Sequence, residues 1–477
     1  MTKVRTRFAP SPTGYLHIGG LRTALYGYLY AKKQGGDFVL RIEDTDTERY
    51  VEGSVQIIYD TLKDSGVVYD EGPDIGGNYG PYVQSERKAI YKEYAEKLVE
   101  LGGAYYCFCD KERIESLKDE NGNIRYDKHC LKLSKEEIAE KIKSGVPYVI
   151  RQNVPTSGTG TYHDLVYGDI SVDYKDIEDG ILLKSDGMPT YNFANVIDDH
   201  LMGITHVIRG IEYLSSTPKY NLMYDAFGWE RPTYIHLPPI MKDAQHKLSK
   251  RNGDASYEDF VKKGYYKESI INYIALLGWS PKSNTEKMTL EELKENFSLD
   301  GISKSPSIFD ETKMKWLSGE YIKELSFDDF KKLALPFLSE SPAYRKFDTD
   351  KLLNLVKTRV QIFSEIPEKL DFLTDFKEYD ISLFVNEKQK ANETLAKELL
   401  PKVKEKLSSL SDFSNGSLFE TLVNLSAELG VKKQALLWIV RIAITGRAAT
   451  AGGATEIAEL LGKDETIKRI DFSINLL

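Results

Sequence analysis

The spacing of apolar residues in the first forty positions predicts a strand, a helix and a second strand. Residues 3–8 alternate polar or charged side chains with apolar ones, which is typical of a short strand. Leucines then recur at i, i+4 and i+8 from Leu21, so 17–33 is predicted to be an amphipathic helix. Residues 38–42 form a compact apolar run. This order begins a βαβ unit and predicts a parallel α/β sheet.

The pattern changes along the rest of the chain. Residues 86–101 predict another amphipathic helix, and the apolar stretch 204–211 predicts another strand. From about residue 256 onward the pattern is helical with few breakers, and 345–477 carries several leucine-rich helices with charged faces. We therefore expect an α/β N-terminal half followed by an α-helical half.

Length and composition place the chain among ordinary globular proteins. Its 477 residues suggest about three domains, and 41% hydrophobic with 29% charged residues excludes disorder and collagen-like structure. We expect no transmembrane helix, because no apolar run reaches 18 residues, and no signal peptide. Three cysteines are too few for a disulfide framework, so we expect a protein of the reducing cytoplasm.

The charge is uneven along the chain. A net charge of -9 and a pI near 5.5 argue, taken alone, against a nucleic-acid partner. Residues 1–41, however, hold seven Lys or Arg and one acid, while residues 42–74 hold ten acids and two bases. Two interpretations stay open: solvated faces of opposite charge, or a basic surface that receives an anionic partner.

The loop between the first strand and the first helix is a candidate phosphate site. It runs over 10–20, and ligands in open α/β sheets bind at the carboxyl ends of strands, where a helix N-terminus also attracts phosphate. Gly19 and Gly20 would let a nucleotide approach the backbone closely, and His17 could donate hydrogen bonds to phosphate oxygens. The alternative is that these residues only shape a turn.

A second candidate lies some 230 residues further on, at 247–251. Lys247, Lys250 and Arg251 place three cations within five residues, next to a glycine-containing turn. Lysine ammonium groups can neutralise the charge that develops in phosphoryl or adenylyl transfer. The alternative is a solvated basic loop.

Together the two segments resemble the signature pair of class I aminoacyl-tRNA synthetases. Further motifs resemble the glutamyl-tRNA synthetase family; they are Arg7–Gly14, Arg41–Asp46, Pro81–Arg87, Asp186–Asn195, Asp198–Glu212, Ile444–Arg447 and Leu461–Lys463. The fourth position of the first signature is Gly20 rather than His, a variant familiar in this family. The resemblance covers essentially the whole chain.

The resemblance implies an architecture. It consists of a Rossmann-like catalytic domain at 1–107 and 191–245, an inserted α/β acceptor-binding domain at 108–190, a stem-contact fold at 246–325, and an α-helical anticodon-binding domain at 326–477 with an internal boundary near 378. Glutaminyl enzymes carry β-barrels in place of the helical half, and the tRNA-modifying paralogues lack this half.

The resemblance also implies a function: ATP-dependent ligation of L-glutamate to the 3′ end of tRNA(Glu). Glutamyl-adenylate forms first, with Mg²⁺ accompanying ATP, and then acylates the terminal adenosine. Neither step needs an enzyme nucleophile, so positioning and charge stabilisation carry catalysis. We expect a monomer that requires bound tRNA before it activates glutamate.

The site residues implied by the resemblance fall into two groups. In the amino-acid pocket, Arg7 faces the substrate side-chain carboxylate with Arg209 assisting, and Glu43 accepts from the α-ammonium group. The same pocket is completed by Ala9, Ser11, Tyr191 and Asn195. ATP is held by Thr13, His17, Gly19, Gly20, Glu212, Ile240, Lys247, Leu248, Ser249, Lys250 and Arg251, of which His17, Lys247 and Lys250 are the catalytic residues. Met241 is an alternative to Ile240.

All three cysteines fall within 24 residues. Cys107 and Cys109, followed by Tyr126 and Cys130, resemble the zinc knob of some glutamyl-type enzymes. We expect structural zinc, and its fourth ligand stays open between Tyr126, His129 and water. Three reduced cysteines without a metal are the alternative.

Candidate surfaces for RNA are the basic block 1–41 and the segments 386–406 and 431–450, because phosphates dominate RNA affinity; the alternative for each is a solvated helix face. Arg359 lies in the region expected to read the anticodon. Two competing functions fit the sequence less well: a small-molecule nucleotidyltransferase, which the helical half disfavours, and a non-catalytic RNA-binding paralogue, which the intact signature residues disfavour.

Overall fold

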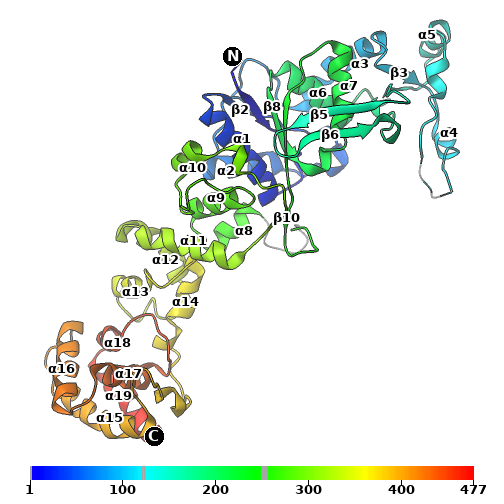
Figure 1. The fold of residues 1–477 in the computed structure, drawn as a ribbon. Coiled ribbons are helices and arrows are strands. Elements are labelled where there is room, and N and C mark those ends of the chain that lie inside the picture. Colours follow the sequence, from blue (N-terminus) through cyan, green and yellow to red (C-terminus); the bar gives the residue numbers. More distant parts are fainter. Residues whose placement is uncertain (1–2, 121, 123, 249–255) are drawn as a thin grey trace. The chain divides into compact units, whose positions relative to one another are not determined.

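The computed structural model describes residues 3–120, 122, 124–248 and 256–477 (Figure 1). The chain folds as two compact units. The α/β unit comprises Met1–Phe260 and Ile270–Asp310, and the helical unit comprises Val261–Ser269 and Glu311–Leu477. In the described part of the chain, no helix is both long and apolar enough to cross a membrane.

A parallel βαβ arrangement opens the α/β unit, as the apolar spacing predicts. Strands β1 (Arg5–Phe8) and β2 (Asp37–Leu40) pair in parallel, joined by helix α1 (Ile18–Lys33). The leucines at i, i+4 and i+8 are all fully buried, which explains why this helix packs on the sheet. Strand β8 (His206–Gly210) lies beside β1 and pairs in parallel with β9 (Thr233–Leu237).

A hairpin from the middle of the chain extends this sheet. Strands β5 (Thr159–Asp164) and β6 (Gly168–Asp173) pair with each other, and β5 adds in parallel to β9, so the order is β6-β5-β9-β8. Part of the segment 108–190 therefore builds the same sheet as β8 and β9. The boundaries of an inserted domain stay a prediction.

The α/β unit also contains two smaller sheets and several helices. A three-stranded sheet joins β3 (Ala104–Cys107), β4 (Val149–Gln152) and β7 (Ile181–Leu183), and β10 (Ile240–Met241) pairs with β11 (Ser307–Ile308). The helices are α2 (Ser54–Asp64), α3 (Lys88–Glu100), α4 (Lys111–Glu115), α5 (Lys135–Lys143), α6 (Tyr191–Leu201), α7 (Thr217–Phe227) and α10 (Leu290–Asn296), while α8 (Tyr257–Lys262) and α9 (Lys267–Leu276) cross the division between the units.

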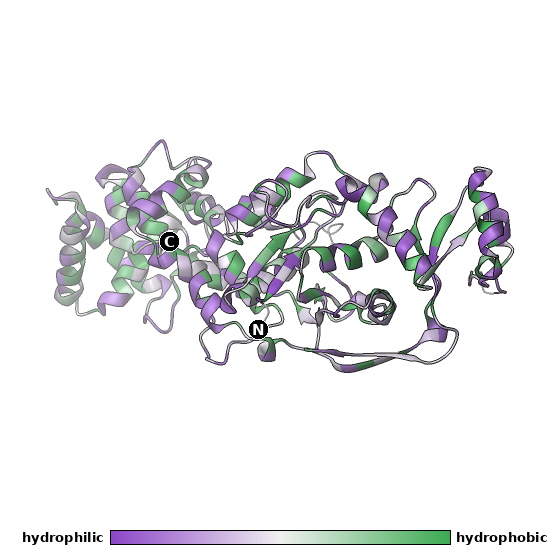
Figure 2. Ribbon diagram, turned by 90° about the horizontal axis from the view of Figure 1, so that it is seen from above, coloured by the Kyte–Doolittle hydropathy of each residue, from purple (hydrophilic) through white to green (hydrophobic). Residues whose placement is uncertain are grey.

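Leucine-rich helices form the second unit, as expected. They are α11 (Glu311–Glu324), α12 (Phe327–Leu338), α13 (Thr349–Val356), α14 (Ile366–Lys369), α15 (Glu393–Ser408), α16 (Asn415–Glu428), α17 (Lys433–Thr445), α18 (Ala454–Leu461) and α19 (Lys463–Leu476). Hydrophobic and hydrophilic residues are interspersed along the helices (Figure 2), and buried hydrophobic residues of this unit form one core. Pro336 and Pro401 lie inside α12 and α15 rather than between helices.

Most cations of the basic block at 1–41 are buried, so the expected RNA contact stays an open prediction only for Lys3, Lys32 and Lys33. Four of its seven cations, Arg5, Arg7, Arg22 and Arg41, are buried, and their guanidinium groups bond acidic side chains or backbone carbonyls inside the unit. The acids come from later in the sequence, for instance Glu71, which lies 2.8 Å from Arg5. Charges that are separated along the chain therefore neutralise one another in space.

Candidate active site

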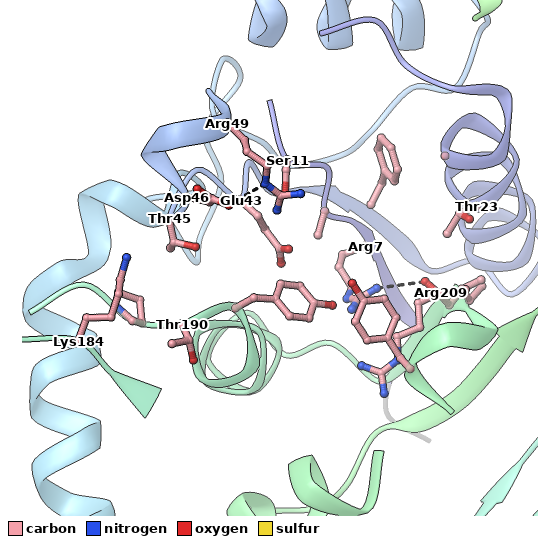
Figure 3. A pocket seen from close by; sticks show the side chains of 18 residues that line it. Arg7, Ser11, Thr23, Glu43, Thr45, Asp46, Arg49, Lys184, Thr190 and Arg209 are labelled. Atoms are coloured by element: carbon pink, nitrogen blue, oxygen red, sulfur yellow. Dashed lines mark hydrogen bonds and ion pairs between the residues drawn. The ribbon is translucent and has the colours of Figure 1, made fainter. Parts of the chain in front are cut away.

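A cavity of about 540 Å³ opens where β1 and β8 end (Figure 3). Seven of the predicted site residues line it: Arg7, Ala9, Ser11, Gly20, Glu43, Tyr191 and Arg209. The topology explains this convergence, because the carboxyl ends of parallel strands share one edge of a sheet. Its lining includes buried ionised groups of both signs, which is unusual for a cavity and typical of a site for a small charged molecule.

A buried ion-pair network supports one side of the cavity. The Asp199 carboxylate accepts from Arg7 Nε at 3.0 Å and from Arg41 Nη1 at 2.7 Å. Arg41 also donates to Glu43 Oε1 at 3.0 Å. Burial alone would raise the pKa of Asp199, but the two arginines hold it below its ordinary value. Arg7 therefore enters the cavity with a carboxylate already beside it.

The charge of the Glu43 carboxylate is less fully offset by neighbouring cations than the charge of Asp199. It is buried, and this burial raises the pKa of its carboxyl above the ordinary value in spite of Arg41. A bound cation next to this carboxylate would lower the pKa again and gain free energy. Glu43 is thus suited to accept a substrate ammonium group, the role implied by the resemblance.

Arg209 has a different environment. Its Nε donates to His236 Nε2 at 3.1 Å, and its Nη2 donates to Thr217 Oγ1 at 2.7 Å. The rings of Tyr213 and Tyr220 lie 5.1 and 4.9 Å from its guanidinium carbon. Among the described residues, no carboxylate forms an ion pair with Arg209. A buried cation without an acidic partner is costly, and an anionic ligand would relieve that cost.

The start of α1 carries the first signature beside this cavity. His17 is the N-cap residue, and its Nδ1 accepts from the backbone N–H of Gly19 at 3.0 Å. The first turn of α1 contains no acid, so the positive end of the helix dipole is not neutralised. Gly20 lines the cavity, whereas Gly19 and His17 do not line it. This end of the helix suits a phosphate group.

The second signature begins on a hairpin. Leu248 donates its backbone N–H to the Ile240 carbonyl at 3.1 Å, and Lys247 bridges to Met241 with its side chain exposed. Ile240 itself is buried and does not line the cavity. The predicted residues Ser249, Lys250 and Arg251 lie outside the described part of the chain.

Three further predicted residues do not reach the cavity wall. Thr13 is exposed, and Asn195 is buried with its side-chain amide donating to the Tyr191 carbonyl at 2.6 Å. Glu212 is exposed, but its carboxylate folds over Gly210, which does line the cavity. The structure therefore places Glu212 at the rim.

Sequence reasoning missed part of the lining. The cavity also contains polar and charged side chains for which no role was predicted: Thr23, Thr45, Asp46, Arg49, Lys184, Thr190 and Tyr213. Figure 3 shows Arg49 bonded to Asp46, at 2.7 Å. Three of the seven, Thr45, Asp46 and Thr190, belong to motifs quoted above, so the motif boundaries were a usable signal for them; the other four carried no local signal.

The cysteine cluster forms as predicted from its spacing. The Sγ atoms of Cys107, Cys109 and Cys130 all lie within 4.8 Å of one another. The Tyr126 hydroxyl lies 3.3 Å from Cys107 Sγ and 3.4 Å from Cys109 Sγ, whereas the His129 side chain is exposed and outside the cluster. Tetrahedral zinc with bonds of about 2.3 Å needs sulfur atoms roughly 4 Å apart, so three thiolates and a phenol oxygen fit it.

The helical unit carries a groove of mixed chemistry. Arg441 lies 4.9 Å from the centre of the Trp438 ring, and exposed Phe419 lines the same groove. Burial lowers the pKa of Arg441, whose described contacts are with aromatic and polar groups. Arg359 and Arg447 line a neighbouring groove, where Arg447 pairs with Asp371 at 2.8 Å. Aromatic faces next to arginines suit unstacked nucleobases.

Comparison with known families matches almost the entire chain. Residues 3–316 match a family described as tRNA synthetases class I (E and Q), catalytic domain, and residues 329–474 match a family described as anticodon binding domain.

Individual relatives agree. The chain is 57% identical to a glutamate–tRNA ligase of Clostridium kluyveri, with 100% of this chain and 99% of the relative covered, and 54% identical to that of Clostridium acetobutylicum with the same coverage. A solved glutamate–tRNA ligase from Elizabethkingia meningosepticum, in complex with its amino acid, is similar with TM-score 0.86 and 36% identity over 99% of each chain. A glutamate–tRNA synthetase structure from Elizabethkingia anophelis gives TM-score 0.87 and 36% identity, covering 99% of this chain and 100% of the other.

Proposed function

Because the chain belongs to the glutamate–tRNA ligases, which are class I aminoacyl-tRNA synthetases, we propose that it joins L-glutamate to the 3′ end of tRNA(Glu). The reaction uses ATP and proceeds in two steps through glutamyl-adenylate. The observation that carries this proposal is the cavity that pairs an under-compensated carboxylate, Glu43, with a buried arginine that lacks an acidic partner, Arg209.

The amino-acid pocket is matched to glutamate by charge. Glu43 accepts from the α-ammonium group. Arg209 rather than Arg7 is the main receptor of the side-chain carboxylate, because Asp199 already pairs with Arg7; this proposal reverses the order in which the resemblance ranks the two arginines. Glutamine has the same shape but cannot neutralise the arginine, so its binding leaves a buried charge uncompensated. Sites of this kind can discriminate by a factor of about 10⁴ or more.

ATP binds at the start of α1, where the helix dipole and His17 act on its phosphates. Lys247 and Lys250 of the second signature add positive charge to the triphosphate, and Mg²⁺ would accompany ATP. The enzyme residues orient the glutamate carboxylate toward the α-phosphorus and offset the charge that develops there. No side chain serves as a nucleophile.

Zinc supplies structure rather than chemistry. Cys107, Cys109, Cys130 and Tyr126 would hold it, because the three Sγ atoms lie within 4.8 Å of one another and the Tyr126 hydroxyl lies 3.3 and 3.4 Å from two of them, whereas His129 is exposed. The Arg151 guanidinium lies 4.4 Å from the centre of the Tyr126 ring and offsets the negative charge of the ligands.

Two arginine-containing grooves of the helical unit, at Trp438 with Arg441 and at Arg359 with Arg447, receive the anticodon loop, and the Trp438 groove offers an aromatic face to an unstacked base. The enzyme works as a monomer in the cytoplasm, where its tRNA product is used.

The test is ATP–pyrophosphate exchange with glutamate or glutamine, with and without tRNA. We expect exchange only with glutamate and tRNA together. Lys250→Ala should lower exchange sharply while tRNA binding, measured by filter retention, stays intact. Absence of exchange under every condition would overturn the proposed function, and exchange without tRNA would overturn the expected requirement for bound tRNA.

A further inference from the structure

Arg209 depends on a second layer of residues for its orientation. Its Nε–H points at His236 Nε2 rather than at a carboxylate, and one of its terminal nitrogens is held by the Thr217 hydroxyl. Arg209 lines the same cavity as Arg7 and Glu43 (Figure 3). An arginine held by neutral acceptors keeps its full positive charge for a ligand. In an arginine paired with a carboxylate, that charge is already neutralised.

The imidazole of His236 has only one tautomer that satisfies its neighbours. His236 is completely buried, and its Nδ1 lies 2.7 Å from Asp164 Oδ2. The Asp164 carboxylate also accepts the backbone N–H groups of Val166, Tyr167 and His236, so it is an acceptor only. Nδ1 must therefore carry the proton, which leaves the Nε2 lone pair for Arg209.

Burial keeps this imidazole neutral. Desolvation lowers the pKa of His236, and the neighbouring Arg209 lowers it further, while the bond to Asp164 acts in the opposite direction. A second proton on Nε2 would point at the Arg209 N–H and break the contact. The neutral form is thus required by geometry as well as favoured by its surroundings.

Strand register brings the three side chains together. Arg209 on β8 is the direct partner of His236 on β9, and Asp164 at the end of β5 is the partner of Tyr234, two residues before His236. The three residues come from three adjacent parallel strands, so the sheet itself sets their order. No loop needs to close to form the chain of hydrogen bonds.

We propose that Asp164 and His236 form a positioning dyad that orients Arg209 without neutralising it, and that preference for a carboxylate over an amide side chain depends on this dyad. This inference rests on the proposed function, because the anion that Arg209 receives is taken to be the glutamate side chain. His236 and Asp164 are positioning residues: they act through Arg209 and do not touch the substrate.

The experiment compares three substitutions in the full chain. His236→Leu removes the acceptor with little change in volume, and His236→Gln keeps an acceptor oxygen. His236→Glu places a carboxylate beside Arg209. The measurements are the KM for L-glutamate, the KM for ATP and kcat in tRNA-dependent exchange, the inhibition constant of L-glutamine, and the thermal midpoint of unfolding.

We expect His236→Leu to raise the KM for glutamate about 10- to 100-fold, the range for losing one charge-assisted contact, with little change in the KM for ATP. The inhibition constant of glutamine should move less, so discrimination falls. His236→Gln should restore the KM to within a few fold, and His236→Glu should raise it at least as far as His236→Leu. His206→Leu, a histidine on the same strand as Arg209 but bonded elsewhere, is the matched control and should leave the KM unchanged.

Asp164→Asn provides a second test should His236→Leu fail to fold. Asparagine preserves the shape, but its amide can donate to His236 Nδ1 and so favours the tautomer with the proton on Nε2. Nε2 can then no longer accept from Arg209, so the KM for glutamate should rise in the same way. The inference is overturned by an unchanged KM for glutamate, by equal losses in all parameters, or by failure of His236→Gln to restore the KM. Loss of glutamate-dependent exchange in the unsubstituted protein would instead overturn the proposed function.

Discussion

The two arginines of the pocket are held by opposite chemistry. Arg7 is paired with the Asp199 carboxylate, which Arg41 also shares, whereas Arg209 is held by an imidazole, a hydroxyl and aromatic rings. Both side chains are buried to nearly the same extent. The difference therefore lies in the partners and not in exposure to water.

This difference separates stability from selectivity. A network of paired charges such as that around Asp199 holds a fixed geometry, and breaking one pair strands a buried charge. A cation held by neutral partners contributes less to the fold but keeps its charge available for an anionic ligand. Substitutions in the Asp199 network should therefore lower the free energy of unfolding. Substitutions around Arg209 should instead raise the KM for glutamate.

The largest expected effect is a loss of stability in the buried ion-pair network, which includes Asp198, Asp199 and Arg41. Asp198 is completely buried and accepts from Gln84, Arg87 and Tyr91 at 2.7–2.8 Å. Asp198→Ala should lower the free energy of unfolding by about 3–5 kcal/mol, because it strands the Arg87 guanidinium. Urea unfolding measures this. Asp60→Ala, on an exposed face of α2, is the control and should change it by less than about 0.5 kcal/mol. Equal losses in the two variants would contradict the prediction.

Replacing each arginine by glutamine tests the comparison directly. Arg209→Gln should raise the KM for glutamate about 10- to 100-fold while the free energy of unfolding changes little, because no acid loses its partner. Arg7→Gln should lower both affinity and stability, since Asp199 then keeps only Arg41. Exchange kinetics give the KM for glutamate, and urea unfolding gives the free energy of unfolding, for both variants on the same preparations. A reversal, with Arg209→Gln as the less stable variant, would remove the distinction between the two sides.

As pH falls, the free energy of unfolding should fall because of His236 before it falls because of Asp199. The pKa of His236 is lowered in the folded protein by burial and by Arg209, while the unfolded value is about 6.5. Below pH 6.5 the unfolded chain takes up a proton that the folded chain refuses, so stability falls as pH falls, by at most about 1.4 kcal/mol per pH unit. Asp199, whose pKa is lowered, loses its contribution only below about pH 4.

Urea unfolding of the unsubstituted protein and of His236→Gln at several values between pH 7.5 and 5 isolates this contribution from those of the other histidines. The stability difference between them should shrink as pH falls. A difference independent of pH would show that His236 is not the group responsible.

The smallest effect concerns surface charge. Lys3 pairs with Asp37 at 2.6 Å but is exposed, so Lys3→Gln should cost less than about 1 kcal/mol and leave tRNA affinity unchanged. Exposed Lys433 on the helical unit offers the contrast: Lys433→Gln should reduce the salt dependence of tRNA binding by about 0.7 in log–log slope if it meets one phosphate. Titrations at several salt concentrations measure both, and an equal response would mean that the N-terminal charges do meet RNA.

Much of the fold could be read from local patterns. The leucine spacing from Leu21 predicted α1, and the order of apolar runs predicted a parallel sheet, because burial on one face imposes the period of the element. The β5–β6 hairpin that extends this sheet was not predicted, since its pairing with β9 joins segments some 70 residues apart. No local signal encodes such a pairing.

The candidate site shows the same division. Motifs identified Arg7, Glu43, Tyr191 and Arg209, and the structure places all four around one cavity. The sequence did not indicate that Asp199 neutralises Arg7, or that His236 does not neutralise Arg209. The charge count of the N-terminal block was misleading for a related reason, because a run of cations in sequence says nothing about which acids it meets after folding.

By itself, the sequence determined the family, the alternation of elements and the residue types that carry the chemistry, since all of these are written in local order and spacing. Only the tertiary structure decided which of these charges are free to act. The energy of a buried charge depends on the few groups within hydrogen-bonding distance, and strands and helices from distant parts of the chain supply those groups. Arg7 and Arg209 are the same residue type in the same cavity, and their neighbours alone make one part of the scaffold and the other the proposed receptor for a carboxylate.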